Sequence, residues 1–369
     1  MMDKVFSLRK ILEKHGNLVE KTPMLSNYIA AGQLGINCVS LSSIWDAPYK
    51  AIGLIEQYQV GAFLVDLIKP PDINSEGMRK YLTVSRVVRE TFSSICEQDM
   101  GYITFSQNYY IKRAEDYLGF INLLDDLAEF YLKDTNPPIA ITWSPHLLSC
   151  VLKSYSKKLE MVEAGSEYVY KTSVVANHDD NGNRLLHQEH KRARVFQDNK
   201  KYKTHRITSS EFLRLIEFTK EMAGIGEYPN SESILLLTAA ELGSITIPEL
   251  EGCYIEDIET DMILGYILAT RLSQDSWGIL SKCVRKKYPK GKNIQSVTAH
   301  LMAYQASGEL HDGLYYCHDS GDCGSPESNM AKYKNKFLSN GVFGPIWSAV
   351  MPKNLAGLKE KKFGLTIHF

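Results

Sequence analysis

Residues 184–206 hold the densest group of side chains that could bind a ligand by charge. The segment contains eight Lys or Arg and two acidic residues, a local net charge of +6 in a chain whose formal net charge is −1. Phe196, Tyr202 and three histidines stand among the cations. Cations contact phosphates and aromatic rings stack on bases, so this composition fits single-stranded nucleic acid as well as it fits a solvated surface. The predicted contacts are Arg184, Lys191, Arg192, Arg194, Lys200, Lys201, Lys203 and Arg206.

A second basic run occupies residues 282–292 and contains six Lys or Arg and no acid. The pattern predicts that it begins at the C-terminal end of a helix. The helix dipole favours cations there, which accounts for only part of the run. The predicted phosphate contacts are Arg285, Lys286, Lys287 and Lys290. A weaker cluster, Lys332, Lys334 and Lys336, surrounds Tyr333.

Metal binding and catalysis find little support in the motifs. Cys317, His318, Asp319, Asp322 and Cys323 are potential ligands, but a zinc site needs a second pair of matching spacing, so a polar loop is predicted. Asp125 and Glu129 share one helix face and could hold a divalent cation, although a solvated face is the simpler interpretation. The chain lacks a nucleophile elbow and a glycine-rich phosphate loop. We therefore predict no catalytic residue, metal or cofactor, and no enzyme.

The bulk composition limits where the chain can work. Its seven cysteines are odd in number and widely spaced, which predicts a reducing compartment, either the cytoplasm or the nucleus, or a virion. No apolar run approaches the ~20 residues of a membrane-spanning helix, so no membrane partner is expected.

The fold predicted from these patterns is mainly α, with two helical lobes and a small β-hairpin between them. The predicted regions are an N-terminal helical lobe (1–165), a hairpin with the basic junction (166–208), a C-terminal helical lobe (209–306) and an irregular extension (307–369). Alternation at residues 167–176 and the turn at 179–183 predict the hairpin, whose return strand carries the basic residues. Helical patterns are found at residues 1–16, 75–98, 109–132, 211–224, 231–243, 255–274 and 275–289. The acidic run at 249–261 is interpreted as a solvated face.

The function predicted from the basic runs is sequence-independent binding of single-stranded RNA, by a self-assembling protein that coats nucleic acid. This layout is similar to that of the nucleoproteins of negative-strand RNA viruses, with no shared motif and no residue role carried over. Two alternatives stay open. One is a metal-dependent nuclease or hydrolase using Asp125 and Glu129 or the loop at 317–323, and the other is a shell or scaffold protein. The tail at 363–369 alternates apolar residues, which predicts a strand that is added either to another subunit or to its own lobe.

Overall fold

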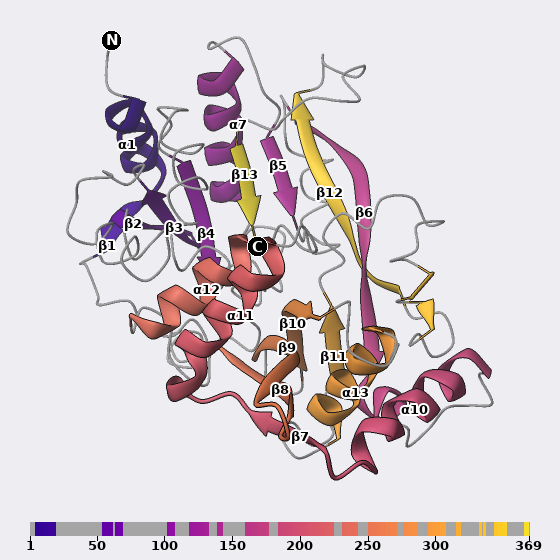
Figure 1. The fold of residues 1–369 in the computed structure, drawn as a ribbon. Helices are drawn as coiled ribbons and strands as arrows, with labels where there is room; N and C mark the ends of the chain where they lie inside the picture. The colour runs from indigo at the N-terminus through magenta and orange to yellow at the C-terminus, as the bar shows by residue number, and fades with distance from the viewer. Residues whose placement is uncertain are drawn as a thin grey trace. The chain divides into compact units, whose positions relative to one another are not determined.

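The structure is a computed structural model of all 369 residues. It describes residues 4–19, 54–61, 63–68, 102–107, 118–132, 139–142, 159–176, 184–224, 231–242, 250–271, 276–285, 294–307, 315–318, 332–333, 335–336, 343–352 and 365–368. The chain forms two compact units (Figure 1). Unit 1 is Met1–Ser166 with Pro345–Phe369, and unit 2 is Glu167–Gly344. The chain passes between them within β6 (Leu159–Lys171) and within β12 (Phe343–Pro352).

Unit 1 contains an antiparallel sheet in the order β1 (Asn17–Val19), β2 (Leu54–Val60), β3 (Phe63–Ile68) and β4 (Tyr102–Gln107). Helix α1 (Lys4–His15) packs against α7 (Leu118–Leu132) and buries Leu8 and Leu12. The amphipathic helix predicted at the N-terminus is confirmed as α1. Strand β5 (Ile139–Thr142) pairs antiparallel with β12 and parallel with β13 (Leu365–His368).

Unit 2 is built on a sheet in the order β6, β11 (Tyr315–His318), β10 (Ser276–Val284), β9 (Met262–Arg271), β8 (Glu251–Asp257) and β7 (Tyr202–Arg206). Neighbouring strands are antiparallel except β10 and β11, which run parallel and are connected through α13 (Ile294–Ala306). A parallel pair requires such a crossover.

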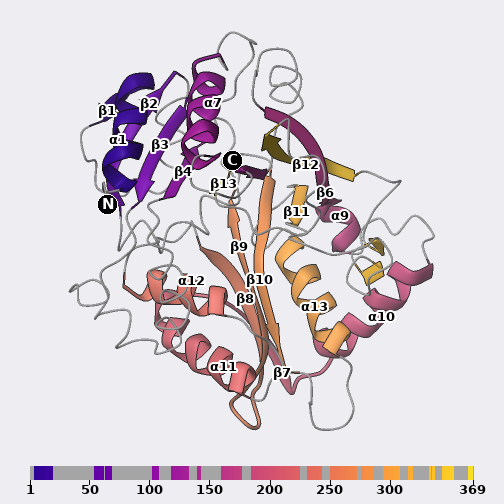
Figure 2. The ribbon, with the colours of Figure 1, turned by 90° about the horizontal axis from the view of Figure 1, so that it is seen from above.

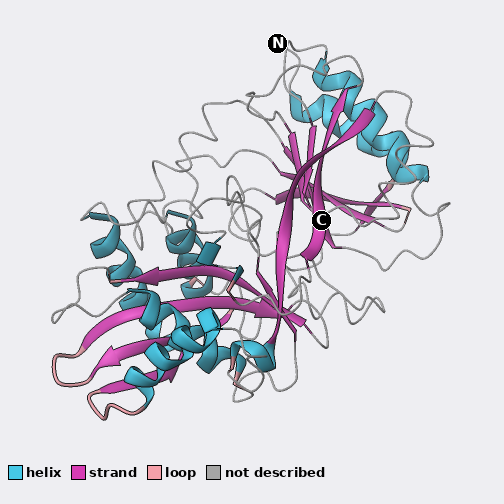
Figure 3. Cartoon of the chain, turned by 90° about the vertical axis from the view of Figure 1, so that its right-hand side faces the viewer, coloured by secondary structure: helices cyan, strands magenta, loops and turns pink. Residues whose placement is uncertain are grey.

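Helices cover both faces of the unit 2 sheet (Figures 2 and 3). Helices α11 (Phe212–Gly224) and α12 (Ser231–Glu241) lie on one face, and α13 with α10 (Arg184–Gln197) lies on the other. The short helices α9 (Thr172–Val175) and η2 (Ser209–Glu211) complete the unit. Alternate residues of a strand point to opposite faces, so Cys253 and Ile255 of β8 join the core under α13 while Tyr266 of β9 faces α11.

The predicted fold class, mainly α with a small hairpin, is wrong. Residues 255–274 and 275–289 were expected to be helical, but β8, β9 and β10 occupy most of them. Strand β9 is buried on both faces, so it is a nearly continuous apolar run, and periodicity cannot distinguish such a strand from a buried helix. The helices predicted at 211–224 and 231–243 are confirmed as α11 and α12.

Most of the basic segment is helix α10, and its end, Tyr202–Arg206, is strand β7, which pairs with β8 and is not the return strand of a hairpin with residues 167–176. The buried residues of α10, Leu186, Glu189, His190, Ala193 and Phe196, recur at helical spacing. The predicted turn at 179–183 and the predicted helix at 75–98 lie outside the described residues.

The strand predicted in the C-terminal tail is confirmed at residues 365–368. It pairs with β5 of its own chain, from Leu365 opposite Ile139 to His368 opposite Thr142, which is the packing in cis that the sequence left open. Across the described ranges, no helix has the length and apolar character needed to cross a membrane.

Candidate functional site

The described pairing of β10 with β11 ends beside a bulge in β10. Four residue pairs join the strands, from Ser276 opposite Tyr315 to Ile279 opposite His318. The register between β10 and β9 then shifts between Ile279 and Ser281. Strand β10 continues to Val284 with β9 on one side, and the described residues provide no partner strand on the other. Within the described residues, a length of backbone edge is therefore open in the sheet.

The N-terminus of α13 lies at the end of this open edge. Gly265 of β9 brings them together, because a Cβ on it would lie 2.8 Å from Val284 Cγ1 and 3.2 Å from Val297 Cγ1. Val284 ends β10 and Val297 is in the first turn of α13. The first turn of a helix offers unpaired N–H groups and the positive end of its dipole. The basic run at 282–292 connects the two elements.

Hydroxyl groups support the bulge from the α11–α12 face. Ser281 Oγ hydrogen-bonds Ser233 Oγ of α12, and the Tyr266 hydroxyl lies 2.8 Å from Thr219 Oγ1 of α11. Burial raises the pKa of the Tyr266 phenol above its usual range. Tyr254, Tyr266 and Cys283 lie opposite one another across β8, β9 and β10.

Arg285 is held by protein groups. Its Nη1 and Nη2 lie 2.5 and 2.8 Å from the two carboxylate oxygens of Glu221, and its guanidinium lies 5.4 Å from the centre of the Phe218 ring. This pair ties the end of β10 to α11. Of the four predicted phosphate contacts in this run, Lys286, Lys287 and Lys290 lie outside the described residues.

Two of the cations predicted in the central segment are paired with acidic side chains. Arg192 donates to Glu189 Oε1 over 2.9 Å, and this carboxylate is only 1% exposed. Lys201 Nζ lies 3.2 Å from Asp257 Oδ2 and also pairs with Glu259. The first pair lies within α10, and the second joins the residue before β7 to the end of β8 and the turn that follows it.

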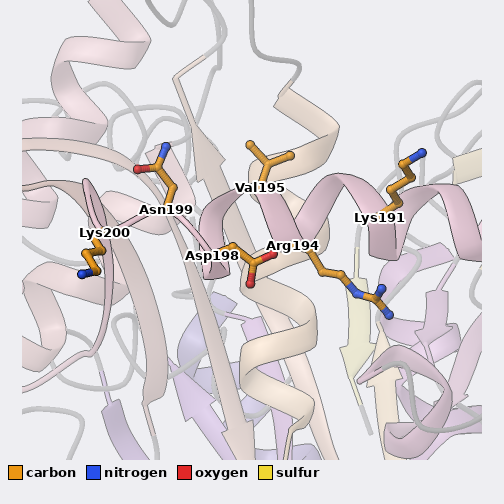
Figure 4. Close-up of a pocket in the computed structure, with 6 residues that line it drawn as sticks. All are labelled: Lys191, Arg194, Val195, Asp198, Asn199 and Lys200. Atoms are coloured by element: carbon orange, nitrogen blue, oxygen red, sulfur yellow. The ribbon is translucent and has the colours of Figure 1, made fainter.

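The remaining predicted cations of the central segment lie on the surface. They are Arg184, Lys191, Arg194, Lys200, Lys203 and Arg206. Three of them line a shallow pocket of about 540 Å³ with Val195, Asp198 and Asn199 (Figure 4). Figure 4 shows Lys191 and Arg194 extending from α10, with Lys200 beyond its C-terminal end. Every lining residue is at least partly exposed, so water competes with a ligand for its polar groups.

A network on β7, β8 and α11 was missed by the sequence analysis. Glu256 is buried between Arg214, which binds its Oε1, and His205, whose Nε2 lies 3.1 Å from its Oε2. His205 stacks on Tyr254 at 4.8 Å between ring centres. The acidic run was interpreted as a solvated face, whereas Glu251, Glu256 and Asp257 are buried in β8. The sequence alone does not show that these residues are neighbours, because their proximity depends on the register between β7 and β8.

The weaker candidates are the lysines at 332–336, the acidic residues of α7 and the loop at 317–323. Some of these residues pair with other side chains, and others lie outside the described residues. Lys336 donates to Glu189 Oε1 over 2.8 Å, and its Nζ lies 5.5 Å from the ring centre of buried Tyr333. Lys332 is exposed, and Lys334 and Cys323 lie outside the described residues.

Asp126, beside Asp125 and near Glu129, accepts hydrogen bonds from Lys14 at 2.6 Å and contacts His15 Nε2 at 2.7 Å. Within the described ranges, no group of three or more His, Cys, Asp or Glu residues could hold a metal ion.

Known proteins match this chain in fold and not in sequence. No protein-family model and no curated protein sequence matches it. A conserved protein of unknown function from Bacteroides thetaiotaomicron VPI-5482 is similar with a TM-score of 0.57 at 11% identity, over 91% of this chain and 99% of that chain. L-PGS from Bacillus licheniformis gives 0.48 at 11% identity, over 95% and 92% of the chains. A tandem GNAT protein from the clavulanic acid biosynthesis pathway gives 0.43 at 9% identity, over 95% and 94%.

At these identities the similarity shows the fold alone, which is α/β and which this chain shares with the Bacteroides protein. This fold corrects the functional prediction, because the similarity to nucleoproteins rested on two helical lobes, whereas each unit of this chain contains a β-sheet. The predictions of a non-enzymatic, RNA-coating, nucleocapsid-like viral protein and of single-stranded RNA as its partner are therefore wrong.

Proposed function

We propose that this chain is an acyltransferase that binds its acyl donor, a thioester of coenzyme A or a similar phosphopantetheine carrier, where β10 and β11 separate. One observation carries the proposal. The parallel pairing ends at Ile279 and His318 beside a bulge, while β10 continues to Val284 and the first turn of α13.

The chemistry of such a donor matches this arrangement. A pantetheine arm is extended and carries amide groups, which can pair with an open strand edge as an added strand would. Its phosphates suit a helix N-terminus. The connection from β10 to α13 supplies the cations Lys286, Lys287 and Lys290, whereas Arg285 is engaged by Glu221. The phosphates that these lysines were expected to contact would thus belong to a small molecule.

The proposed reaction is acyl transfer to an amine. The amine nitrogen attacks the thioester carbon, the C–N bond forms, the C–S bond breaks, and the proton lost by nitrogen balances the thiolate. A bulge re-aims backbone groups and is common beside active sites. The one at Ile279–Ser281 would present such groups at the reacting carbonyl.

The test is binding of coenzyme A and acetyl coenzyme A to the full chain by titration calorimetry. A variant with Lys286, Lys287 and Lys290 replaced by Ala should weaken binding by about tenfold or more, since each charge-assisted phosphate contact contributes on the order of 1 kcal/mol. The matched control replaces Lys191, Arg194 and Lys200, three cations at the pocket of Figure 4, and should leave binding unchanged. Equal losses in both variants would indicate non-specific charge, and no binding by the intact chain would refute the proposal.

A further inference from the structure

The strands of unit 1 repeat the order and direction of the strands of unit 2. Strands β1, β2, β3 and β4 are antiparallel neighbours in chain order, as are β7, β8, β9 and β10. In each unit a helix stands between the fourth strand and a fifth, α7 before β5 in unit 1 and α13 before β11 in unit 2. The fifth strand has an antiparallel neighbour in both units, β12 beside β5 and β6 beside β11. The two units therefore share one arrangement of strands.

The fourth strand of each unit also contains a bulge. Leu280 of β10 falls between two residues that pair with β9 and has no residue opposite it. Ser106 of β4 falls in the same way between two residues that pair with β3. Antiparallel pairing does not require an extra residue at this place. The bulge is thus a further likeness between the units, in addition to the strand order.

The units differ in what lies between the fourth and the fifth strand. In unit 2, β10 pairs directly with β11 and then leaves the open edge described above. In unit 1, strand β13 lies between β4 and β5 (Figure 1). It pairs in parallel with β5, from Leu365 opposite Ile139 to His368 opposite Thr142, and it contacts β4. An extended peptide therefore fills, in unit 1, the place that corresponds to the open edge of unit 2.

The connection after the fourth strand differs in charge between the units. Residues 285–293, between β10 and α13, contain five Lys or Arg and no acidic residue. Residues 108–117, between β4 and α7, contain two Lys or Arg and two acidic residues, so their formal net charge is zero. Cations favour the binding of phosphate groups, and unit 1 lacks this excess of cations. Residues 363–369, which include β13, contain no Lys, Arg, Asp or Glu and suit a place without net charge.

We infer that the space between β4 and β5 of unit 1 is a binding site for an extended, uncharged peptide segment, and that β13 of the same chain occupies it. The physical reason is the one given for a pantetheine arm, because the amide groups of an extended chain hydrogen-bond to the edge of a strand. The peptide site follows from the strand arrangement alone. One consequence rests on the proposed function: the chain binds a single acyl donor, in unit 2, because β13 closes the corresponding place in unit 1.

Displacing β13 within the full chain tests the peptide site. Proline has no N–H, so Thr366→Pro with Ile367→Pro removes one donor from each edge of the strand. A fluorescent peptide of residues 363–369 should bind this variant in a one-to-one ratio. It should bind the unmodified chain at least about tenfold more weakly, because the site is filled there. A control peptide with the same two prolines should not bind.

Two results of the peptide titration would overturn the site. One is equal binding of the peptide to the variant and to the unmodified chain. The other is the absence of binding to a variant whose α1 and α7 amides stay protected from hydrogen exchange, because unit 1 is then folded and its site is vacant.

Hydrogen exchange of the unmodified chain decides the occupant even if the proline variant does not fold. Alternate amides of residues 365–368 should exchange at least about tenfold more slowly than in the free peptide, because they donate to β5. Exchange as fast as in the free peptide would overturn the occupation by β13. Slow exchange that becomes fast on dilution of the protein would also overturn it, because a segment from a second copy would then fill the site.

Titration with coenzyme A separates this inference from the proposed function. One molecule should bind per chain, both to the unmodified chain and to the proline variant. Two molecules per chain in the variant would show that unit 1 accepts a donor and would overturn the assignment of its site to an uncharged peptide. No binding by the unmodified chain would refute the proposed function, and the peptide and exchange measurements would still decide the site in unit 1.

Discussion

Arg285 and Glu221 form a two-point ion pair that joins the end of β10 to α11. The separations are 2.5 Å from Nη1 to Oε1 and 2.8 Å from Nη2 to Oε2. The planar fork of arginine matches a carboxylate in this way, and lysine cannot reproduce it. Arg285 belongs to the basic run, so the pair fixes this part of the run at the end of β10.

Replacing Glu221 by Gln should reduce stability modestly and mainly at neutral pH. The hydrogen bonds from Arg285 lower the pKa of Glu221. Its contribution is therefore present above the unfolded carboxyl pKa of about 4.3 and is lost as the pH falls through the folded value. Because the Glu221 side chain is 52% exposed, we expect a loss below about 1 kcal/mol. Urea unfolding at pH 7 and pH 3 measures it, with Glu217→Gln on the same helix as control. An equal loss at both pH values would contradict the ionic origin.

Thr219→Val should destabilise unit 2 by about 1–3 kcal/mol, because it removes a hydrogen-bond partner of the buried Tyr266 hydroxyl. Thr238→Val should be neutral or stabilising, because it removes a buried hydroxyl that has no hydrogen-bond partner among the described residues. The two substitutions are chemically identical and lie on adjacent helices. Thermal or urea unfolding compares them, and similar losses would indicate that packing alone matters at both sites.

The sequence predicted those elements whose pattern reflects a single buried face. Helices α11 and α12 were predicted because their apolar residues recur at helical spacing or follow a cap. Strand β9 was not predicted, because residues 262–269 are apolar on both faces and carry no period-two signal. Strand β8 was harder to predict because its acidic residues suggest an exposed segment. Glu256 and Asp257 are buried nevertheless, because each pairs with a basic residue distant in sequence, Arg214 and Lys201.

The candidate site was less accessible to sequence reasoning than the fold. Its basic connection was noticed as a charge run. The buried hydroxyl contacts that support the bulge were not noticed. Thr219, Tyr266 and Ser281 are single polar residues inside apolar segments and form no motif. A polar residue in an apolar run is a signal, but its meaning depends on which strand or helix faces it. Register and packing across 47 and 48 positions of sequence set those contacts.

Asp126→Asn should loosen the packing of α1 on α7 in unit 1. Hydrogen bonds from Lys14 and His15 lower the pKa of Asp126. The stabilisation is thus present above the unfolded value of about 3.9 and is lost as the pH falls through the folded one. Because the Asp126 side chain is 27% exposed, we expect the variant to lose about 1 kcal/mol of unfolding free energy. Hydrogen exchange of the α1 amides at pH 7 should accelerate in the variant. Unchanged protection would show that Leu8 and Leu12 alone fix the helix.

His300 should make unit 2 less stable as the pH falls from 6.5 to 4. Burial lowers its pKa from 6.5 to about 4, and its Nε2 lies 2.6 Å from Thr204 Oγ1. In this window the unfolded chain binds a proton that the folded chain does not, so unfolding becomes more favourable by up to about 3 kcal/mol. The contribution is complete above pH 6.5. His300→Asn should therefore make the unfolding free energy depend less on pH. This holds even if the substitution lowers the unfolding free energy at pH 7. Urea unfolding at pH 7, 5.5 and 4.5 measures this dependence, and the control is His187→Asn at an exposed position. Parallel curves of unfolding free energy against pH for the unmodified chain and His300→Asn would show that His300 takes up its proton in the folded state.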